Sequence, residues 1–298
     1  MKPELSAALA AHLAERIREM RRRYCKRLAS CQKKFSESAV HELRIETRRL
    51  LALLDLLDAL RVRDSLKKTR KIFKKRLDAF DELRDTHVEL SLLKPLRRDF
   101  PEAREFDLLL LRREKELIGE LRQEIKAVKQ ARLERRLKDL EKHLRKSAKA
   151  KPKRARGSLA AAVLSDAFAQ VVFLRRRVRR DNTKTIHQMR VSFKRFRYMS
   201  ELLQPLLPRL TRKRLRRMQE FQSIMGDIQD MEVLLAGLKK AVTAQCLSAA
   251  TMRSLRDELL RRRRRLIDVF LATKDDLFDF DPGNFARRAR GESKSLHT

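Results

Sequence analysis

One stretch of the chain places a histidine and several basic residues at helical spacing, a combination suited to binding phosphate. On a helix turning about 100° per residue, Arg190, Lys194 and Arg197 fall within roughly 80° of His187, on one side. Guanidinium groups bind phosphate oxygens bidentately and keep their charge when partly desolvated. A histidine facing several cations should have a lowered pKa, which a bound phosphate would raise again. The row therefore predicts a polyanion site. The alternative is that the histidine hydrogen-bonds a neighbouring helix and fixes packing.

The same pattern occurs once before in the chain. The segment 40–49 realigns on 186–195 at an offset of 187 − 41 = 146 residues, so that the first row consists of His41, Arg44 and Arg48. Leu51 takes the place of Arg197, which predicts that the first copy contributes less to an anion site. Each row ends in an acidic residue, and a basic residue lies on the flank of each; these are Asp55, Glu201, Arg49 and Arg195.

Two further features repeat at an offset of 145 residues. A second basic row pairs Lys67, Lys68 and Lys71 with Arg212, Lys213 and Arg216, which predicts either secondary ligand contacts or an ordinary solvated face. The carboxylates Asp85 and Asp230 also coincide. A carboxylate followed by apolar residues on a helix favours a salt-bridge partner over a catalyst.

The elements that position these rows are predicted to be long helices. The chain has 298 residues with only 6 Gly and 7 Pro, too few for many tight turns. Apolar residues at helical spacing predict helices near 4–33, 39–60, 64–99 and 102–148, then near 158–180, 184–204, 209–245 and 248–274. We therefore expect an all-α protein with a four-helix half at 1–148, a basic linker at 149–157, a second four-helix half at 158–278 and a flexible tail at 279–298. Internal symmetry predicts that the halves pack about a pseudo-twofold axis.

The net charge of the chain points to a polyanionic partner. Lys and Arg number 75 and Asp and Glu 40, which gives +35. The three cysteines, Cys25, Cys31 and Cys246, form no C-x-x-C pair, and the longest uncharged run, 241–252, is shorter than the roughly 20 apolar residues that a spanning helix needs. We expect a cytoplasmic protein without a membrane segment.

Motifs for catalysis and cofactor binding are not recognised in the sequence. It has no Gly-rich phosphate loop, no H-E-x-x-H, no Cys/His cluster with metal spacing and no nucleophile paired with a base. We therefore expect no metal, no cofactor and no enzymatic activity. The charge alone also fits weak, nonspecific binding of nucleic acid, although Tyr24 and Tyr198 are the only tyrosines and no tryptophan is present for base stacking.

Four motifs resemble the CHAD domain, a family named for its recurring histidine in an α-helical domain. They are His41-x-x-Arg-x-x-x-Arg-Arg49, His187-x-x-Arg-x-x-x-Lys-Arg-x-Arg-Tyr198, Leu83-Arg-Asp85 and Met225-Gly-Asp-Ile-Gln-Asp230. The resemblance spans residues 5 to 274 and implies two four-helix bundles around a basic central pore. It also implies binding of inorganic polyphosphate and association with polyphosphate granules. The residues expected to line the site are His41, Arg44, Arg48, Arg49, His187, Arg190, Lys194, Arg195 and Arg197.

Overall fold

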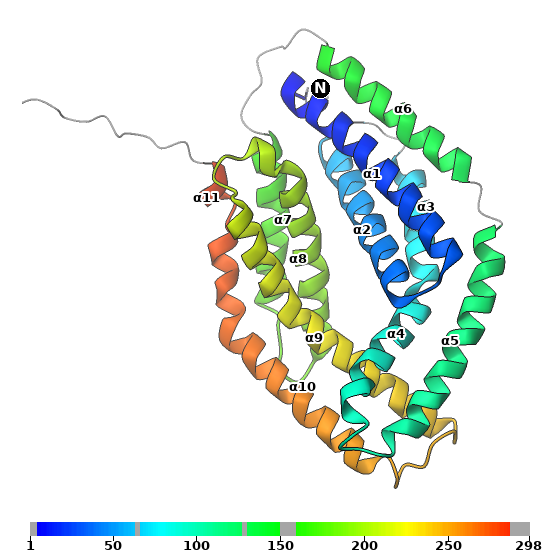
Figure 1. Ribbon diagram of the computed structural model, residues 1–298. Helices are drawn as coiled ribbons and strands as arrows, with labels where there is room; N and C mark the ends of the chain where they lie inside the picture. Colours follow the sequence, from blue (N-terminus) through cyan, green and yellow to red (C-terminus); the bar gives the residue numbers. More distant parts are fainter. Residues whose placement is uncertain (1–4, 63–65, 127–129, 150–158, 287–298) are drawn as a thin grey trace, which may run out of the picture.

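The protein folds as an assembly of α-helices in a computed structural model that describes residues 5–62, 66–126, 130–149 and 159–286 (Figure 1). The all-α prediction is confirmed, since these residues form α-helices, three short 3₁₀ helices and no strand. The first part of the chain contains α1 (Ala7–Lys33), α2 (Glu37–Ala59), α3 (Leu66–Ala79), α4 (Asp81–Leu93), α5 (Ala103–Lys126) and α6 (Gln130–Lys149). The second part contains α7 (Leu159–Arg175), α8 (Thr183–Leu203), α9 (Arg212–Thr243), α10 (Arg253–Thr273) and the short α11 (Gly283–Ala286).

Helix ends follow local chemistry at several of these boundaries. The side chains of Ser6, Ser36 and Thr211 accept a hydrogen bond from a first-turn backbone N–H of α1, α2 and α9. Pro95 and Pro205 lie in the 3₁₀ turns Lys94–Leu96 and Gln204–Leu206, which end α4 and α8, because proline has no N–H to continue the helical ladder.

The prediction of one helix over 64–99 was wrong, because the chain breaks at Phe80 into α3 and α4. The break lies at a buried arginine from α2. Arg44 Nη1 donates to the Leu77 carbonyl at 2.7 Å, and Arg44 Nη2 donates to Asp81 Oδ1 at 2.5 Å. In an uninterrupted helix that carbonyl would accept from the N–H of residue 81. The guanidinium therefore replaces one bond of the helical ladder.

The corresponding stretch of the second half, α9, continues without a break. At the offset of 145 residues, Gly226 takes the place of Asp81. Arg190, the counterpart of Arg44, lies beside this glycine, since a Cβ added there would be 3.7 Å from Arg190 Nη2. The second half thus lacks both the carboxylate and the helix break.

The helices do not divide into one four-helix bundle for each half. Helix α1 packs on α2 and α6, α2 also packs on α3, and α7, α8, α9 and α10 pack in chain order (Figure 1). Helix α4 packs mainly on α5 of its own half and on α9 of the second half. A separate apolar cluster forms there, with Phe106 from α5, Leu234 from α9 and Leu255 from α10.

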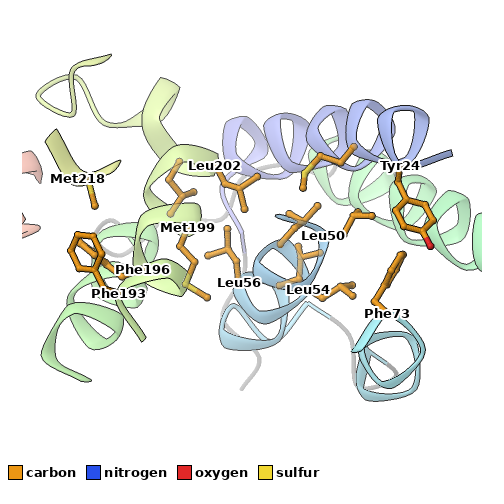
Figure 2. Close-up of a cluster of buried hydrophobic side chains, with 14 of the residues drawn as sticks. Tyr24, Leu50, Leu54, Leu56, Phe73, Phe193, Phe196, Met199, Leu202 and Met218 are labelled. Carbon is orange, nitrogen blue, oxygen red and sulfur yellow. The ribbon is translucent and has the colours of Figure 1, made fainter. Parts of the chain in front are cut away.

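The main core runs across the contact between α2 and α8 (Figure 2). Leu50, Leu54 and Leu56 of α2 belong to the same buried cluster as Phe196 and Met199 of α8. Both halves therefore share one core, which fixes the relative position of the two histidine-bearing helices.

The structure describes only part of the predicted linker, 149–157, and of the predicted tail, 279–298. Residue 149 ends α6, and the rest of the linker lies outside the described residues. The tail was predicted from residue 279, but Phe280 is 1% exposed and contacts the rings of Phe193 and Phe221. Residues 287–298 of the predicted tail are outside the described part of the chain.

Gly237 allows close packing of α9 on α4. A Cβ added at Gly237 would overlap the buried carboxylate of Glu89. We expect Gly237→Ala to lower the free energy of unfolding by about 1–3 kcal/mol, as overpacking does, and Glu89→Ala to remove most of that loss in the double variant. Urea unfolding of the four proteins measures the coupling.

The matched control for this variant is Gly119→Ala in α5, where an added Cβ meets nothing within 4 Å. Since alanine is the better helix former, this change should raise stability by about 0.5–1 kcal/mol. A loss at Gly237 that persists without the Glu89 side chain would show that the clash is not its cause.

Candidate functional site

Helices α2 and α8 bring the two basic rows together. We call Arg44 and Arg48 of α2 with Arg190, Lys194 and Arg197 of α8 the central cation cluster. Lys194 is at its centre: burial and then the charges of the four arginines lower the pKa of Lys194 to about 6. The two rows predicted from the repeat therefore act on one another across the α2–α8 contact.

Arg48 experiences the same environment from the other helix. Burial, followed by the charges of Arg44 and Arg190, lowers the pKa of Arg48 to about 10, while Tyr198 and Asp81 act in the opposite direction. Within the described part of the chain, no acidic side chain lies within 4.0 Å of the charged nitrogens of Arg48, Arg190 or Lys194. Three partly buried cations thus have one another as neighbours and no salt-bridge partner.

The arginines that lead the two rows differ in their partners. Arg44 is 3% exposed and is held by the Leu77 carbonyl and Asp81, as described above. Burial lowers the pKa of Arg190, and Asp230, Tyr198 and Asp227 oppose that effect in this order. Arg190 Nε is buried and has no hydrogen-bond partner among the described residues.

The positive charge of Arg197, unlike that of its neighbours Arg48 and Arg190, is paired with an acidic side chain in the described part of the chain. Its Nε donates to Gln222 Oε1 at 2.8 Å and its Nη1 is paired with Glu201. Its guanidinium also lies over the ring of Tyr198, 4.5 Å from the centroid. Leu51 stands at the corresponding place in α2. The first half therefore lacks an arginine that, in α8, is already bonded to Gln222 and Glu201.

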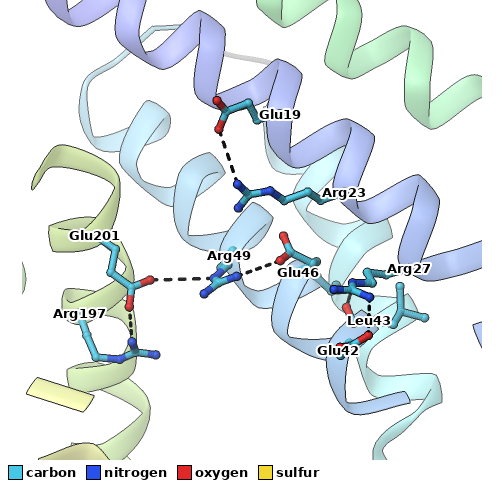
Figure 3. Close-up of polar contacts among 10 residues, drawn as sticks. Glu19, Arg23, Arg27, Glu42, Leu43, Glu46, Arg49, Arg197 and Glu201 are labelled. Carbon is cyan, nitrogen blue, oxygen red and sulfur yellow. Dashed lines mark hydrogen bonds and ion pairs between the residues drawn. The ribbon is translucent and has the colours of Figure 1, made fainter. Parts of the chain in front are cut away.

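The flanking arginines link the two helices by reciprocal salt bridges. Arg49 Nε lies 3.9 Å from Glu201, and Arg195 Nε lies 3.3 Å from Asp55. Both partners are related by the offset of 146 residues, because 195 − 49 and 201 − 55 give the same value. Figure 3 shows Glu201 shared between Arg49 and Arg197, with Arg49 also paired to Glu46 at 2.8 Å. These flanking charges are thus engaged in holding α2 against α8.

The two histidines lie at the exposed ends of the rows. Partial burial and the charges of Arg84, Arg48 and Lys194 lower the pKa of His41, against a smaller opposite effect of Glu37. This direction is the one predicted for a histidine facing cations. His187 Nδ1 lies 2.5 Å from Gln229 Oε1 of α9, so that His187 also has a packing contact.

Two carboxylates that the sequence favoured as salt-bridge partners face the cluster without forming a salt bridge among the described residues. Burial raises the pKa of Asp85 to about 6, and Asp81 and Asp230 add to the effect. Burial also raises the pKa of Asp230, while Arg190, Arg84 and Lys194 lower it. Arg84 and Tyr198, whose charge and ring border the cluster, were not predicted as site residues; the available signal was that both lie within the recurring motifs.

The secondary basic rows are not brought together. Lys67, Lys68 and Lys71 are exposed on α3, which packs on α2 and α4. Arg212, Lys213 and Arg216 are exposed in the first two turns of α9, which packs on α8, α10 and α4. Lys68 and Lys71 line a cavity on α3 instead.

Two further findings concern metals and membranes. Within the described ranges, no group of three or more His, Cys, Asp or Glu side chains is placed to hold a metal ion. The helices described here are each too short or too polar to cross a bilayer.

Comparison with known proteins places this fold. The crystal structure of the CHAD domain from the plant Ricinus communis is similar at a TM-score of 0.70 and 19% sequence identity, over 97% of this chain and 96% of that chain. Comparison with curated protein sequences gives no match. The family model of the CHAD domain matches residues 11–239, which include both histidine rows, α4 and most of α9. The chain belongs to the CHAD domain family.

Proposed function

We propose that this protein is a non-catalytic binder of inorganic polyphosphate, and that the chain of phosphates lies against the central cation cluster. The observation that carries the proposal is the set of three partly buried basic side chains without acidic partners among the described residues: the cations Arg48 and Arg190, and Lys194, whose proton is disfavoured in the free protein. Burying a charge without a partner costs free energy. A bound polyanion would offset this cost at each of the three positions.

An extended polyanion fits this arrangement better than a single phosphate. The cations come from two helices, and His41 and His187 continue the rows beyond them. Successive phosphates of one chain would thus contact α2 and α8 in turn. The family resemblance suggests inorganic polyphosphate in particular, and with it an open basic pore, a cytoplasmic location and attachment to polyphosphate granules.

The proposal includes pseudo-twofold symmetry between the two halves. Its support is the reciprocal pairing of Arg49 with Glu201 and Arg195 with Asp55, the pattern that two equivalent helices make when they cross an axis. Departures from symmetry are local: Asp81 pairs with Arg44, whereas at the place of Asp81 the second half has Gly226, and no described carboxylate lies within salt-bridge distance of Arg190. The second half would therefore contribute more free cationic charge.

Nucleic acid is the competing ligand, because +35 attracts any phosphodiester backbone. Base stacking, however, needs exposed aromatic rings. Tyr198 beside the cluster is 5% exposed and lies under Arg197, and Tyr24 is 2% exposed. The described site therefore offers charge and no stacking surface, which favours a polyanion without bases.

A competition titration tests the proposal. The probe is labelled single-stranded DNA bound to the protein, and the two competitors are polyphosphate and unlabelled DNA of equal total charge. At the same salt concentration, polyphosphate should displace the probe at a lower concentration than the unlabelled DNA does. Affinity should also fall steeply between 50 and 200 mM salt, by a factor of about 10³ for a site that contacts six phosphates. Fluorescence anisotropy measures both.

The controls use the same titration. Heparin of matched charge distinguishes phosphate recognition from bulk charge, and phosphate release followed over hours detects hydrolysis. Equal affinity for polyphosphate, DNA and heparin would overturn the proposal in favour of nonspecific charge, and sustained phosphate release would overturn its non-catalytic part.

A further inference from the structure

A cavity of about 650 Å³ lies between α1, α2, α3 and α6, and Arg44 is one of its lining residues. We call it the α3 cavity. Its volume is within the range of roughly 300–1,000 Å³ that small-molecule sites occupy. Its position could not be predicted from the sequence, since its walls come from four separate helices.

The walls of the α3 cavity are largely apolar. Side chains from α1, α2, α3 and α6 supply this surface, among them Leu28, Leu43, Ile72, Leu77, Phe80 and Leu133. Ile72 and Leu77 are partly exposed, so that apolar surface remains open to a ligand.

The rim of the α3 cavity is strongly basic. Lys68, Lys71, Lys75 and Arg132 are exposed along the rim, and none of them forms a salt bridge within the described part of the chain. Among the described residues that line the cavity, there is no carboxylate. An anion at this rim would meet attraction from several lysines and no repulsion.

Fixed polar groups lie between the rim and the apolar floor. Arg76 Nη1 donates to the Tyr24 hydroxyl at 2.8 Å, which leaves the hydroxyl proton free to donate to a ligand. Arg136 Nη1 lies 3.5 Å from Thr69 Oγ1. Arg44 also lines the cavity, is 3% exposed and has no partner for its buried Nε in the described structure.

We propose that the α3 cavity binds an amphipathic anion, with an aliphatic chain on the apolar floor and a phosphate or carboxylate head at the lysines of the rim. A polyphosphate chain does not fit this role, because it has no apolar part to replace water on the floor. A neutral lipid would leave the lysines unpaired. The apolar floor and the basic rim together therefore select a ligand that has both an aliphatic chain and a negative charge.

Dodecyl phosphate, kept below its micellar concentration, is the probe. Isothermal titration should show one molecule bound for each protein. Octyl phosphate, which is four methylenes shorter, should bind roughly 250-fold more weakly, since each buried methylene contributes a factor of about four. Dodecanoate should bind as well, which would show that the head may be phosphate or carboxylate, and inorganic phosphate alone should bind far more weakly.

Two kinds of variant locate the site. Ile72→Trp fills the cavity and should abolish dodecyl phosphate binding; Ala79→Phe, at another partly buried wall position, serves if the first variant does not fold. Lys71→Glu with Lys75→Glu should weaken binding by about tenfold or more. The matched control is Lys138→Glu with Lys142→Glu, at the same i,i+4 spacing on the exposed face of α6, where the change should be under about threefold.

The same experiments can overturn the inference. Equal affinity for the dodecyl and octyl chains would mean that the cavity does not hold the aliphatic part. Binding that survives both filling variants would place the ligand elsewhere, and equal binding of the uncharged dodecyl maltoside would remove the role of the rim. Polyphosphate affinity of Ile72→Trp should stay unchanged; a parallel loss would mean that the two ligands share one site.

Discussion

Replacing both Arg190 and Lys194 by methionine should weaken polyphosphate binding by about a hundredfold and, at the same time, stabilise the free protein. Each lost charge-assisted contact costs roughly 1.5 kcal/mol of binding free energy, and every 1.4 kcal/mol is tenfold in affinity. Both side chains are partly buried without an acidic partner in the described structure. Methionine removes the cost of burying the Arg190 charge and the amine of Lys194 while filling similar space, so the free energy of unfolding should rise by about 1–4 kcal/mol.

Opposite signs for binding and stability separate a ligand site from a structural one. Affinity is measured by anisotropy and stability by urea unfolding in buffers free of phosphate and sulfate. A double variant that is less stable and binds polyphosphate normally would show that these cations serve packing.

The matched control for this pair is Arg264→Met with Arg265→Met on α10. Both arginines are exposed and form no salt bridge among the described residues, whereas the adjacent Arg261 and Arg262 are paired with Glu258. We expect the control to change affinity by less than about threefold and stability by less than about 0.5 kcal/mol. Equal losses at both places would indicate diffuse charge.

Periodicity and the repeat were sufficient to predict the helices that carry the cluster. Segments 39–60 and 184–204 were predicted from apolar spacing, and α2 and α8 begin and end within two residues of them. Helical spacing places Leu50, Leu54, Phe193 and Phe196 on the face away from the basic rows, and all four are buried. Local spacing is sufficient here because the same face that repeats at 3.6 residues is buried in the shared core.

The break between α3 and α4 could not be predicted in this way. No glycine or proline marks it, and Phe80 is compatible with a helix. Its cause is Arg44, 37 residues away from Asp81 in sequence, which takes the Leu77 carbonyl. Tertiary contacts of this kind override local propensity and leave no local trace.

Which of the arginines are paired with acidic side chains could not be predicted from the sequence either. Helical projection gives Arg44, Arg190 and Arg197 similar places, yet Arg44 is paired with Asp81, Arg197 with Glu201 and Gln222, and Arg190 with no described carboxylate within salt-bridge distance. The difference in charge between the two rows was predicted from Leu51 alone. The structure adds a second origin, the exchange of Asp81 for Gly226, which decides how much positive charge is left for a ligand.

Binding of polyphosphate at pH 8.5 should be accompanied by uptake of close to one proton at Lys194. In the free protein the pKa of Lys194 is about 6, so at this pH the side chain is neutral. Adjacent phosphates favour the charged form and should raise this pKa towards the ordinary value of about 10.5. Because the bound state holds the extra proton, affinity falls as pH rises from about 6 to the pKa of the complex, by up to tenfold for each pH unit.

Lys194→Arg is the variant that isolates this effect. An arginine remains charged throughout the range, so the affinity of Lys194→Arg for polyphosphate should fall less steeply between pH 6.5 and 8.5 than that of the unchanged protein, and the proton uptake assigned to Lys194 should vanish. Titration calorimetry in buffers of different ionisation enthalpy counts the protons. Glu89, whose pKa is raised to about 8 by burial and by Asp85, also titrates here, and the difference between the two proteins removes its contribution. Equal proton uptake by both proteins would mean that Lys194 is not protonated by the bound phosphates.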